Sequence, residues 1–233
     1  MKNTVLITGT NSGIGKSLAN EFGLLGWDVI CSDSHTSTYN RNDSRLKDVS
    51  TVIDCGAINH QFWVKEDPDG NQWMAVMENN CRKLFELYND TIESLRKHEG
   101  IFLTFSSDTA RYAMSCSAAY CSSKAATTSI MKVMAREEDR LSEHGKLPFA
   151  SFITISPATV PETNMVQSLM REYMIKRNVD DFEKAKVDFL SRHHNGTGIP
   201  LDGITDFVIH LLVENRKFTR SISGSDLQVG ELL

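Results

Sequence analysis

Ser107, Tyr120 and Lys124 are the residues whose types and spacing best suit proton transfer. Tyr120 and Lys124 are four residues apart, so on a helix their side chains share one face. A free phenol titrates at about 10, and a neighbouring ammonium favours its ionised form. We therefore expect Lys124 to lower the pKa of Tyr120, which can then exchange a proton with an alcohol or carbonyl whose oxygen Ser107 holds. By itself, a tyrosine–lysine pair at this spacing is typical of an ordinary exposed helix surface.

A glycine-rich segment near the start of the chain predicts a phosphate-binding loop. It follows a short β-branched run, residues 4–8, and precedes apolar positions at helical spacing over residues 14–25. Glycines there allow a tight turn and let a phosphate approach the N–H groups at the helix N-terminus. The alternative for this motif alone is a glycine-rich turn without a ligand. We expect a nicotinamide dinucleotide to contact Gly9, Asn11, Ser12, Gly13, Ile14 and Gly15.

Asp33, at the end of a strand predicted over residues 28–33, indicates which dinucleotide binds. A carboxylate at this place accepts hydrogen bonds from the adenosine ribose and repels a 2′-phosphate. Neither the glycine loop nor Ser34 supplies a lysine or arginine to neutralise such a phosphate. The sequence therefore favours NAD over NADP, unless Asp33 is only the first polar residue of the loop 34–45.

Predicted strands and helices alternate along the chain, which favours a doubly wound parallel α/β sheet of the Rossmann type, with helices on both faces. We expect one domain over residues 1–233, with a substrate lid at about 164–195 whose apolar residues could equally pack against the body. The strands are predicted at 4–8, 28–33, 50–55, 101–106, 150–155 and 221–223 or slightly beyond. The helices are predicted near 14–25, 72–97, 119–142, 164–176, 180–192 and 203–214.

The motif set resembles the short-chain dehydrogenase/reductase family of the single-domain type. Thr8-Gly9-x-x-x-Gly13-x-Gly15 matches the cofactor loop of that family, and Ser107, Tyr120 and Lys124 match its catalytic triad in order and spacing. The resemblance implies that Asn80 is the fourth catalytic residue, supporting a proton relay to the lysine, and that Lys124 also binds the nicotinamide ribose. It implies further cofactor contacts at Cys55, Gly56, Ala57, Pro157, Ala158 and Thr163, and a last strand that includes residues 220–224.

The chain also departs from the family pattern. The Asn-Asn-Ala-Gly segment of the family is here Asp54-Cys55-Gly56-Ala57, and Ala158 replaces a glycine. Only twenty residues separate Asp33 from Asp54, too few for the usual strand and helices, so we expect an open adenine pocket. Asp48-Val49 is interpreted as a remnant of the lost strand, and the polar loop 34–47 as a mobile segment with few apolar anchors.

Composition agrees with an enzyme acting on small molecules. The chain has 233 residues, 40% of them hydrophobic, and a net charge of −5 without a basic stripe, so nucleic acid is not expected as a partner. No membrane span is predicted, and the five cysteines suit a reduced, cytoplasmic protein. No metal site is expected, because adjacent histidines such as His193 and His194 point apart. By the resemblance, helices 72–97 and 119–142 pair in a homodimer or homotetramer.

These observations predict an NAD-dependent oxidoreductase that interconverts a secondary alcohol and a carbonyl. The alternative is a dinucleotide-binding sensor or scaffold with little turnover. Several residues flank the expected cleft but do not identify the small-molecule substrate: His60, Trp63, Asp108, Tyr112 and Met114.

Overall fold

Six parallel strands form one sheet in the computed structural model, which describes residues 3–32, 39–143, 149–191 and 198–230. The strands lie side by side in the order β2-β1-β3-β4-β5-β6. Their bounds are β1 Thr4–Thr8, β2 Asp28–Ser32, β3 Val49–Asp54, β4 Ile101–Phe105, β5 Ser151–Pro157 and β6 Asp226–Val229. The Rossmann-like parallel sheet predicted from the alternating pattern is therefore confirmed.

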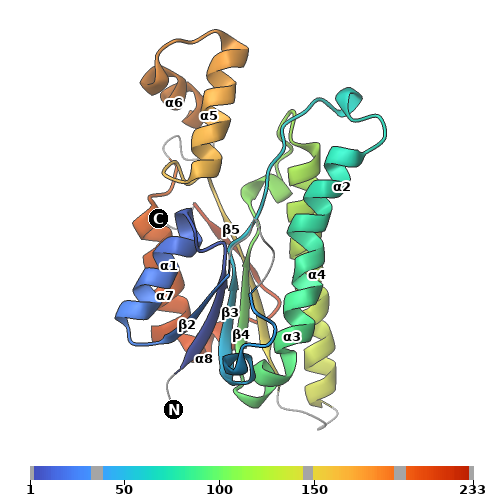
Figure 1. Ribbon diagram of the computed structural model, residues 1–233, viewed down its shortest axis with the longest axis vertical. Helices are drawn as coiled ribbons and strands as arrows, with labels where there is room; N and C mark the ends of the chain where they lie inside the picture. Colours follow the sequence, from blue (N-terminus) through green and yellow to red (C-terminus); the bar gives the residue numbers. More distant parts are fainter. Residues whose placement is uncertain (1–2, 33–38, 144–148, 192–197, 231–233) are drawn as a thin grey trace.

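Helices cover both faces of the sheet, and a third group projects beyond its carboxyl edge (Figure 1). One face is covered by α1 Gly13–Leu24, α7 Leu201–Ile209 and α8 Arg216–Ser221, and the other by α3 Lys83–Lys97 and α4 Ala118–Glu143. The projecting group contains α5 Asn164–Arg177 and α6 Phe182–Leu190, and α2 Asn71–Met77 lies along the amino-terminal part of α4.

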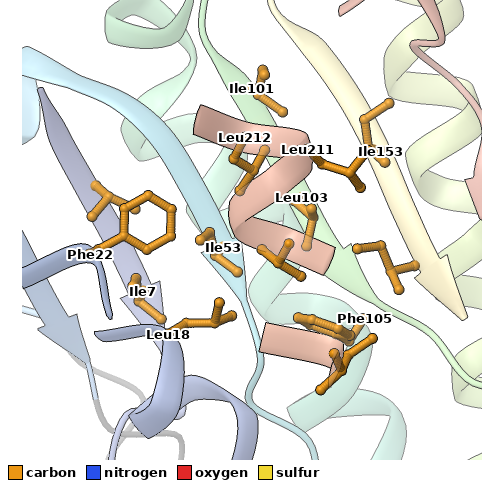
Figure 2. Close-up of a cluster of buried hydrophobic side chains, with 14 of the residues drawn as sticks. Ile7, Leu18, Phe22, Ile53, Ile101, Leu103, Phe105, Ile153, Leu211 and Leu212 are labelled. Atoms are coloured by element: carbon orange, nitrogen blue, oxygen red, sulfur yellow. The ribbon is translucent and has the colours of Figure 1, made fainter. Parts of the chain in front are cut away.

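Alternation along each strand builds a separate core on each face. In β1, Ile7 packs toward Leu18 and Phe22 of α1, whereas Leu6 packs on the opposite side with the α3 residue Leu84. Figure 2 shows the first of these cores, where Ile53 of β3 lies near Ile7 and Leu18. Strands buried on both faces need apolar residues at nearly every position, which explains the continuous apolar runs in the sequence.

The strand order places a crevice at the carboxyl ends of β1 and β3. From β2, on one side of β1, the chain returns to β3 on the other side. Open sheets bind ligands at such a reversal. Among the described residues no strand lies beyond β2, which agrees with the shortened region after Asp33.

Part of this shortened region is more firmly held than the sequence suggested. Tyr39 and Leu46 are buried against the α3 face of the sheet, and the Tyr39 hydroxyl hydrogen-bonds Asp90. The Arg41 guanidinium pairs with Asp90 and Glu86. The apolar anchors of residues 39–47 are few, as expected, but the side chains of Tyr39 and Leu46 pack the segment against the sheet, which speaks against the expected mobility there. Residues 34–38 lie outside the described part.

Three expected boundaries were also wrong. Asp48-Val49 is not a remnant of an outer strand, because Asp48 ends a 3-10 helix, Ser44–Asp48, and Val49 begins β3. The expected helix 72–97 is divided into α2 and α3 by a π-helical turn, Glu78–Arg82. Residues 220–224 do not form the last strand: a turn follows α8, with Gly224 at φ +84°, and the chain joins β5 only at Asp226.

Candidate active site

The glycine loop forms a cradle at the carboxyl end of β1. Gly9 and Gly13 have positive φ values of +69° and +54°, which favour glycine over any residue with a side chain. A β-carbon at Gly15 would lie 2.3 Å from the Gly9 carbonyl oxygen, so this position must be glycine for the loop to close on α1. Because α1 begins at Gly13, unpaired N–H groups and the positive end of the helix dipole face this region.

A cavity of about 480 Å³ extends from this cradle to Tyr120 and to the start of α5. The cavity therefore joins a phosphate cradle to titratable groups, an arrangement that suits a dinucleotide ligand. Its walls include most of the expected cofactor and catalytic residues: Gly9, Ser12, Gly13, Ile14, Gly15, Cys55, Gly56, Ala57, Ser107, Tyr120, Lys124, Pro157, Ala158 and Thr163. Asn11 is exposed and Asn80 is buried behind the wall, while Asp33 lies outside the described residues.

The three residues expected to transfer a proton converge on this cavity. Ser107 follows β4, and its hydroxyl accepts hydrogen bonds from the Thr109 N–H and hydroxyl and contacts an Asp108 carboxylate oxygen at 3.0 Å. Tyr120 and Lys124 lie in the first turns of α4, with the Lys124 Nζ 5.5 Å from the centre of the Tyr120 ring. The ammonium donates to the Phe105 carbonyl at 2.7 Å, so α4 and the end of β4 fix it together.

The electrostatics of Tyr120 differ from the expectation. Burial raises the pKa of the Tyr120 phenol, the Asp108 carboxylate raises it further, and a hydrogen bond with Ser107 opposes the rise. The prediction that Lys124 would lower this pKa was wrong for the protein without a ligand, because desolvation of the phenolate dominates. Burial also lowers the pKa of Lys124 to about 8, with Lys83 as the next cause.

Asn80 lies in the π-helical turn and holds the loop after β3. Its side-chain oxygen accepts from the Ile58 N–H at 2.9 Å, and its amide donates to the Ile58 carbonyl at 2.9 Å and to the Ser123 hydroxyl at 3.0 Å. Ser123 in turn donates to the Tyr120 carbonyl. The π turn thus joins the Ile58 loop to the helix that carries Tyr120.

The nicotinamide end of the cavity is bordered by the segment after β5. The Ala158 N–H donates to the Val229 carbonyl at 2.9 Å, and a β-carbon at Gly230 would lie 3.0 Å from the Ala158 side chain. Glycine at position 230 therefore makes room for the alanine that replaces the family glycine. Thr163 caps α5, and its methyl group would lie 3.3 Å from a β-carbon at Gly13, so α5 begins against the glycine loop.

The substrate side combines residues that the sequence suggested with others that it did not. His60, Asp108 and Met114 line the cavity, whereas Trp63 and Tyr112 are exposed outside it. The segment expected as a lid, residues 164–195, contributes Met165, Leu169, Glu172 and Phe189 to the wall, whereas sequence reasoning missed Asn59. Both polar atoms of the Asn59 amide are buried without a hydrogen-bond partner in the described structure, and no spacing rule in the sequence points to such an amide.

Sequence reasoning also missed a buried ion pair behind the site. Nζ of Lys83 lies 3.1 Å from Oδ1 of Asp54, at the end of β3. The carboxylate at position 54 had been noted as a departure from the family pattern. Its partner could have been suspected because Lys83 is three residues after Asn80 and shares its helix face.

Among the described residues, no helix is long and apolar enough to cross a membrane, and no group of three or more metal-ligating side chains comes together. The five cysteines are free, but they are not uniformly core residues: Cys81 is buried and Cys31 is exposed.

Comparisons with known proteins agree with this geometry. The family model described as short chain dehydrogenase matches residues 28–173. A search of curated proteins gives no match. An aldohexose dehydrogenase from Thermoplasma acidophilum has a similar structure, with a TM-score of 0.76 and 18% identity over 98% of this chain and 92% of that chain.

Two similar structures carry cofactors of both types. An actinorhodin polyketide ketoreductase with NADPH has a TM-score of 0.78 and 17% identity, over 98% of this chain and 95% of that one. A 4-hydroxyisoleucine dehydrogenase complexed with NADH has a TM-score of 0.73 and 19% identity, over 98% of this chain and 97% of that one. At these identities the likeness establishes the fold.

Proposed function

The chain belongs to the short-chain dehydrogenase family, and from that premise we propose that it is an NAD-dependent oxidoreductase that interconverts a secondary alcohol and a carbonyl. The observation that carries the proposal is the convergence of Ser107, Tyr120 and Lys124 on the same cavity as the glycine cradle. When bound, the dinucleotide supplies the nicotinamide that accepts or donates hydride.

We propose distinct roles for the residues of the site. The cradle Gly9, Gly13 and Gly15 binds the pyrophosphate, and Lys124 binds the nicotinamide ribose. Ser107 donates a hydrogen bond to the substrate oxygen, and Tyr120 exchanges the proton with that oxygen. Tyr120 carries its proton at neutral pH, as the acid in carbonyl reduction must, although burial raises its pKa and so makes the phenol a weaker acid.

Asn80 is proposed to act through position rather than by touching the substrate. Its amide fixes the Ile58 loop against α4, and this loop forms the wall beside Tyr120. Helices α5 and α6 are proposed as a substrate lid of the single domain, because Met165, Leu169 and Phe189 contribute an apolar wall to the cavity. As in the family, a homo-oligomer is proposed.

Binding and turnover should be measured separately to test this function. NAD and NADP affinities follow from the tryptophan fluorescence of the protein, and panels of alcohols and carbonyls are then screened through the nicotinamide absorbance band. We expect NAD to bind more tightly than NADP and at least one secondary alcohol or ketone to react. Tight cofactor binding with no reaction across the panels, and no difference between the wild type and Tyr120→Phe, would instead support a sensor or scaffold.

A further inference from the structure

The buried pair Asp54–Lys83 lies behind the cofactor cradle, close to Lys124. Asp54 ends β3 and Lys83 begins α3, and their side chains are 4% and 18% exposed. Burying two charges is expensive, and a buried ion pair is weak grounds for expecting stability. The pair therefore invites a functional explanation, particularly since the family has asparagine at position 54.

The carboxylate of Asp54 is fixed by three strands. The Thr8 hydroxyl of β1 donates to Oδ1 at 2.6 Å, and the Thr104 hydroxyl of β4 donates to Oδ2 at 3.1 Å. The same Thr8 oxygen accepts from the Cys55 and Gly56 N–H groups at 3.2 Å. Asp54 is thus anchored at the end of β3, directly before Cys55 and Gly56, which line the cavity.

The Lys83 ammonium is incompletely neutralised in this position. It lies near one oxygen of Asp54 but is not aligned for a hydrogen bond with it or with any other described group. Both oxygens of Asp54 already accept bonds from threonines. Burial weakens the screening of both charges, so the fields of Lys83 and Asp54 both reach neighbouring groups and oppose one another there.

Lys124 meets the same end of β4 as this pair, because Asp54 accepts from the Thr104 hydroxyl while the Lys124 Nζ donates to the carbonyl of the next residue, Phe105. Lys124 is 5% exposed. The titratable groups that face it are Lys83 from α3, Asp54 and Cys55 at the end of β3, Cys81 from the π turn, and Tyr120 on its own helix. Burial lowers the pKa of Lys124 most, repulsion by Lys83 lowers it next, and attraction by Asp54 opposes both.

We propose that Lys83 is a positioning residue that acts through Lys124: Asp54 holds the Lys83 ammonium behind the cradle, where it repels the charged form of Lys124 and favours the release of its proton. The inference rests on the proposed function for the catalytic meaning of Lys124. The electrostatic link itself does not depend on turnover.

The link can be tested by NMR titration of protein labelled at the lysine ε-carbons, with the Lys124 signal assigned by Lys124→Arg. Lys83→Met should raise the Lys124 midpoint by about one pH unit, whereas Asp54→Asn should lower it. Lys83→Arg should leave it nearly unchanged. Lys97→Met is the matched control, because it removes the same charge from an exposed site on the same helix.

The Lys124 midpoint is expected to rise in Lys83→Met and to fall in Asp54→Asn. These opposite shifts distinguish an electrostatic effect from general damage to the fold. If the unpaired carboxylate prevents Lys83→Met from folding, the neutral double variant Asp54→Asn/Lys83→Met should still show a smaller rise in the midpoint. The proposal is overturned if the Lys124 midpoint of Lys83→Met does not rise above the wild-type value. If Lys83→Met does not fold, the same criterion applies to the double variant.

The pH dependence of kcat/KM supplies the second readout, and its optimum should move upward in Lys83→Met. A shifted NMR midpoint in a protein that turns over no substrate supports the electrostatic link and contradicts only the proposed function. An unchanged midpoint in an active enzyme contradicts only the link.

Discussion

Replacing Lys124 with methionine should stabilise the protein while abolishing turnover. Lys124 is buried, and its pKa is lowered from 10.5 to about 8 on folding. Such a difference corresponds to a folding penalty of about 3 kcal/mol at about pH 7. Methionine keeps most of the stem volume, but it leaves the Phe105 carbonyl without its donor, which costs about 1 kcal/mol. We therefore expect a net gain of about 2 kcal/mol.

The dependence on pH distinguishes this charge effect from improved packing. Because the unfolded chain binds the proton more tightly, the penalty is complete below about pH 8 and fades as the pH approaches about 10.5. Between about pH 7 and about pH 9.5, the advantage of Lys124→Met should shrink by about 2 kcal/mol.

Urea unfolding of wild type, Lys124→Met and Lys132→Met at these two pH values measures the effect. Lys132 is exposed on the same helix and receives the same substitution, so it reports the effect of the chemical change without burial. A Lys124→Met protein that is less stable than wild type at neutral pH, or whose advantage does not vary with pH, would refute the reasoning.

Three further predictions concern the proton, the cradle and the choice of cofactor. Tyr120→Phe should lower kcat by about a hundredfold or more while the NAD affinity by fluorescence stays nearly unchanged, and a variant with most of the wild-type rate contradicts the assigned acid. Gly15→Ala should abolish NAD binding, because the added β-carbon would collide with the backbone of the loop. The control Gly23→Ala adds a β-carbon with nothing within 4 Å, so it should keep NAD binding and raise the unfolding free energy by about 0.5 kcal/mol. Equal NAD affinity in the two variants would contradict the role of the cradle. Asp33→Ala should erode the preference for NAD in the ratio of dissociation constants, and adding Ser34→Arg should reverse it, unless the wild type already binds NADP more tightly.

The sheet was predictable because its signals are local. Strands buried on both faces require apolar runs, and the glycine loop requires residues without side chains, so both leave a direct trace in the sequence. The catalytic trio left a trace for a similar reason, since Tyr120 and Lys124 share one helix turn. The end of the chain was harder: residues 220–224 were assigned to a strand by the resemblance, but the turn at Gly224 is set by contact with β5.

The parts of the site that escaped prediction depend on how distant elements meet. Lys83 and Asp54 approach each other only because α3 packs on β3 at a particular rotation, which the π turn before it helps to set. The pKa of Tyr120 depends on burial and on Asp108, which outweigh the sequence neighbour Lys124. The packing of Tyr39 could not be predicted for the same reason, because its hydrogen-bond partner Asp90 lies fifty-one residues later in the sequence, on α3.

Two largely buried lysines lie where the chemistry is proposed to occur. Lys83 and Lys124 are both withdrawn from water, and one carboxylate faces them, so the cluster retains a positive excess. An apolar replacement of Lys124 would relieve its desolvation, whereas at the Asp54–Lys83 pair only a joint neutral replacement of both partners would do so. The presence of both lysines beside the cradle is therefore better explained by a requirement of the site than by folding, since the neighbouring cores already bury apolar side chains on both faces of the sheet.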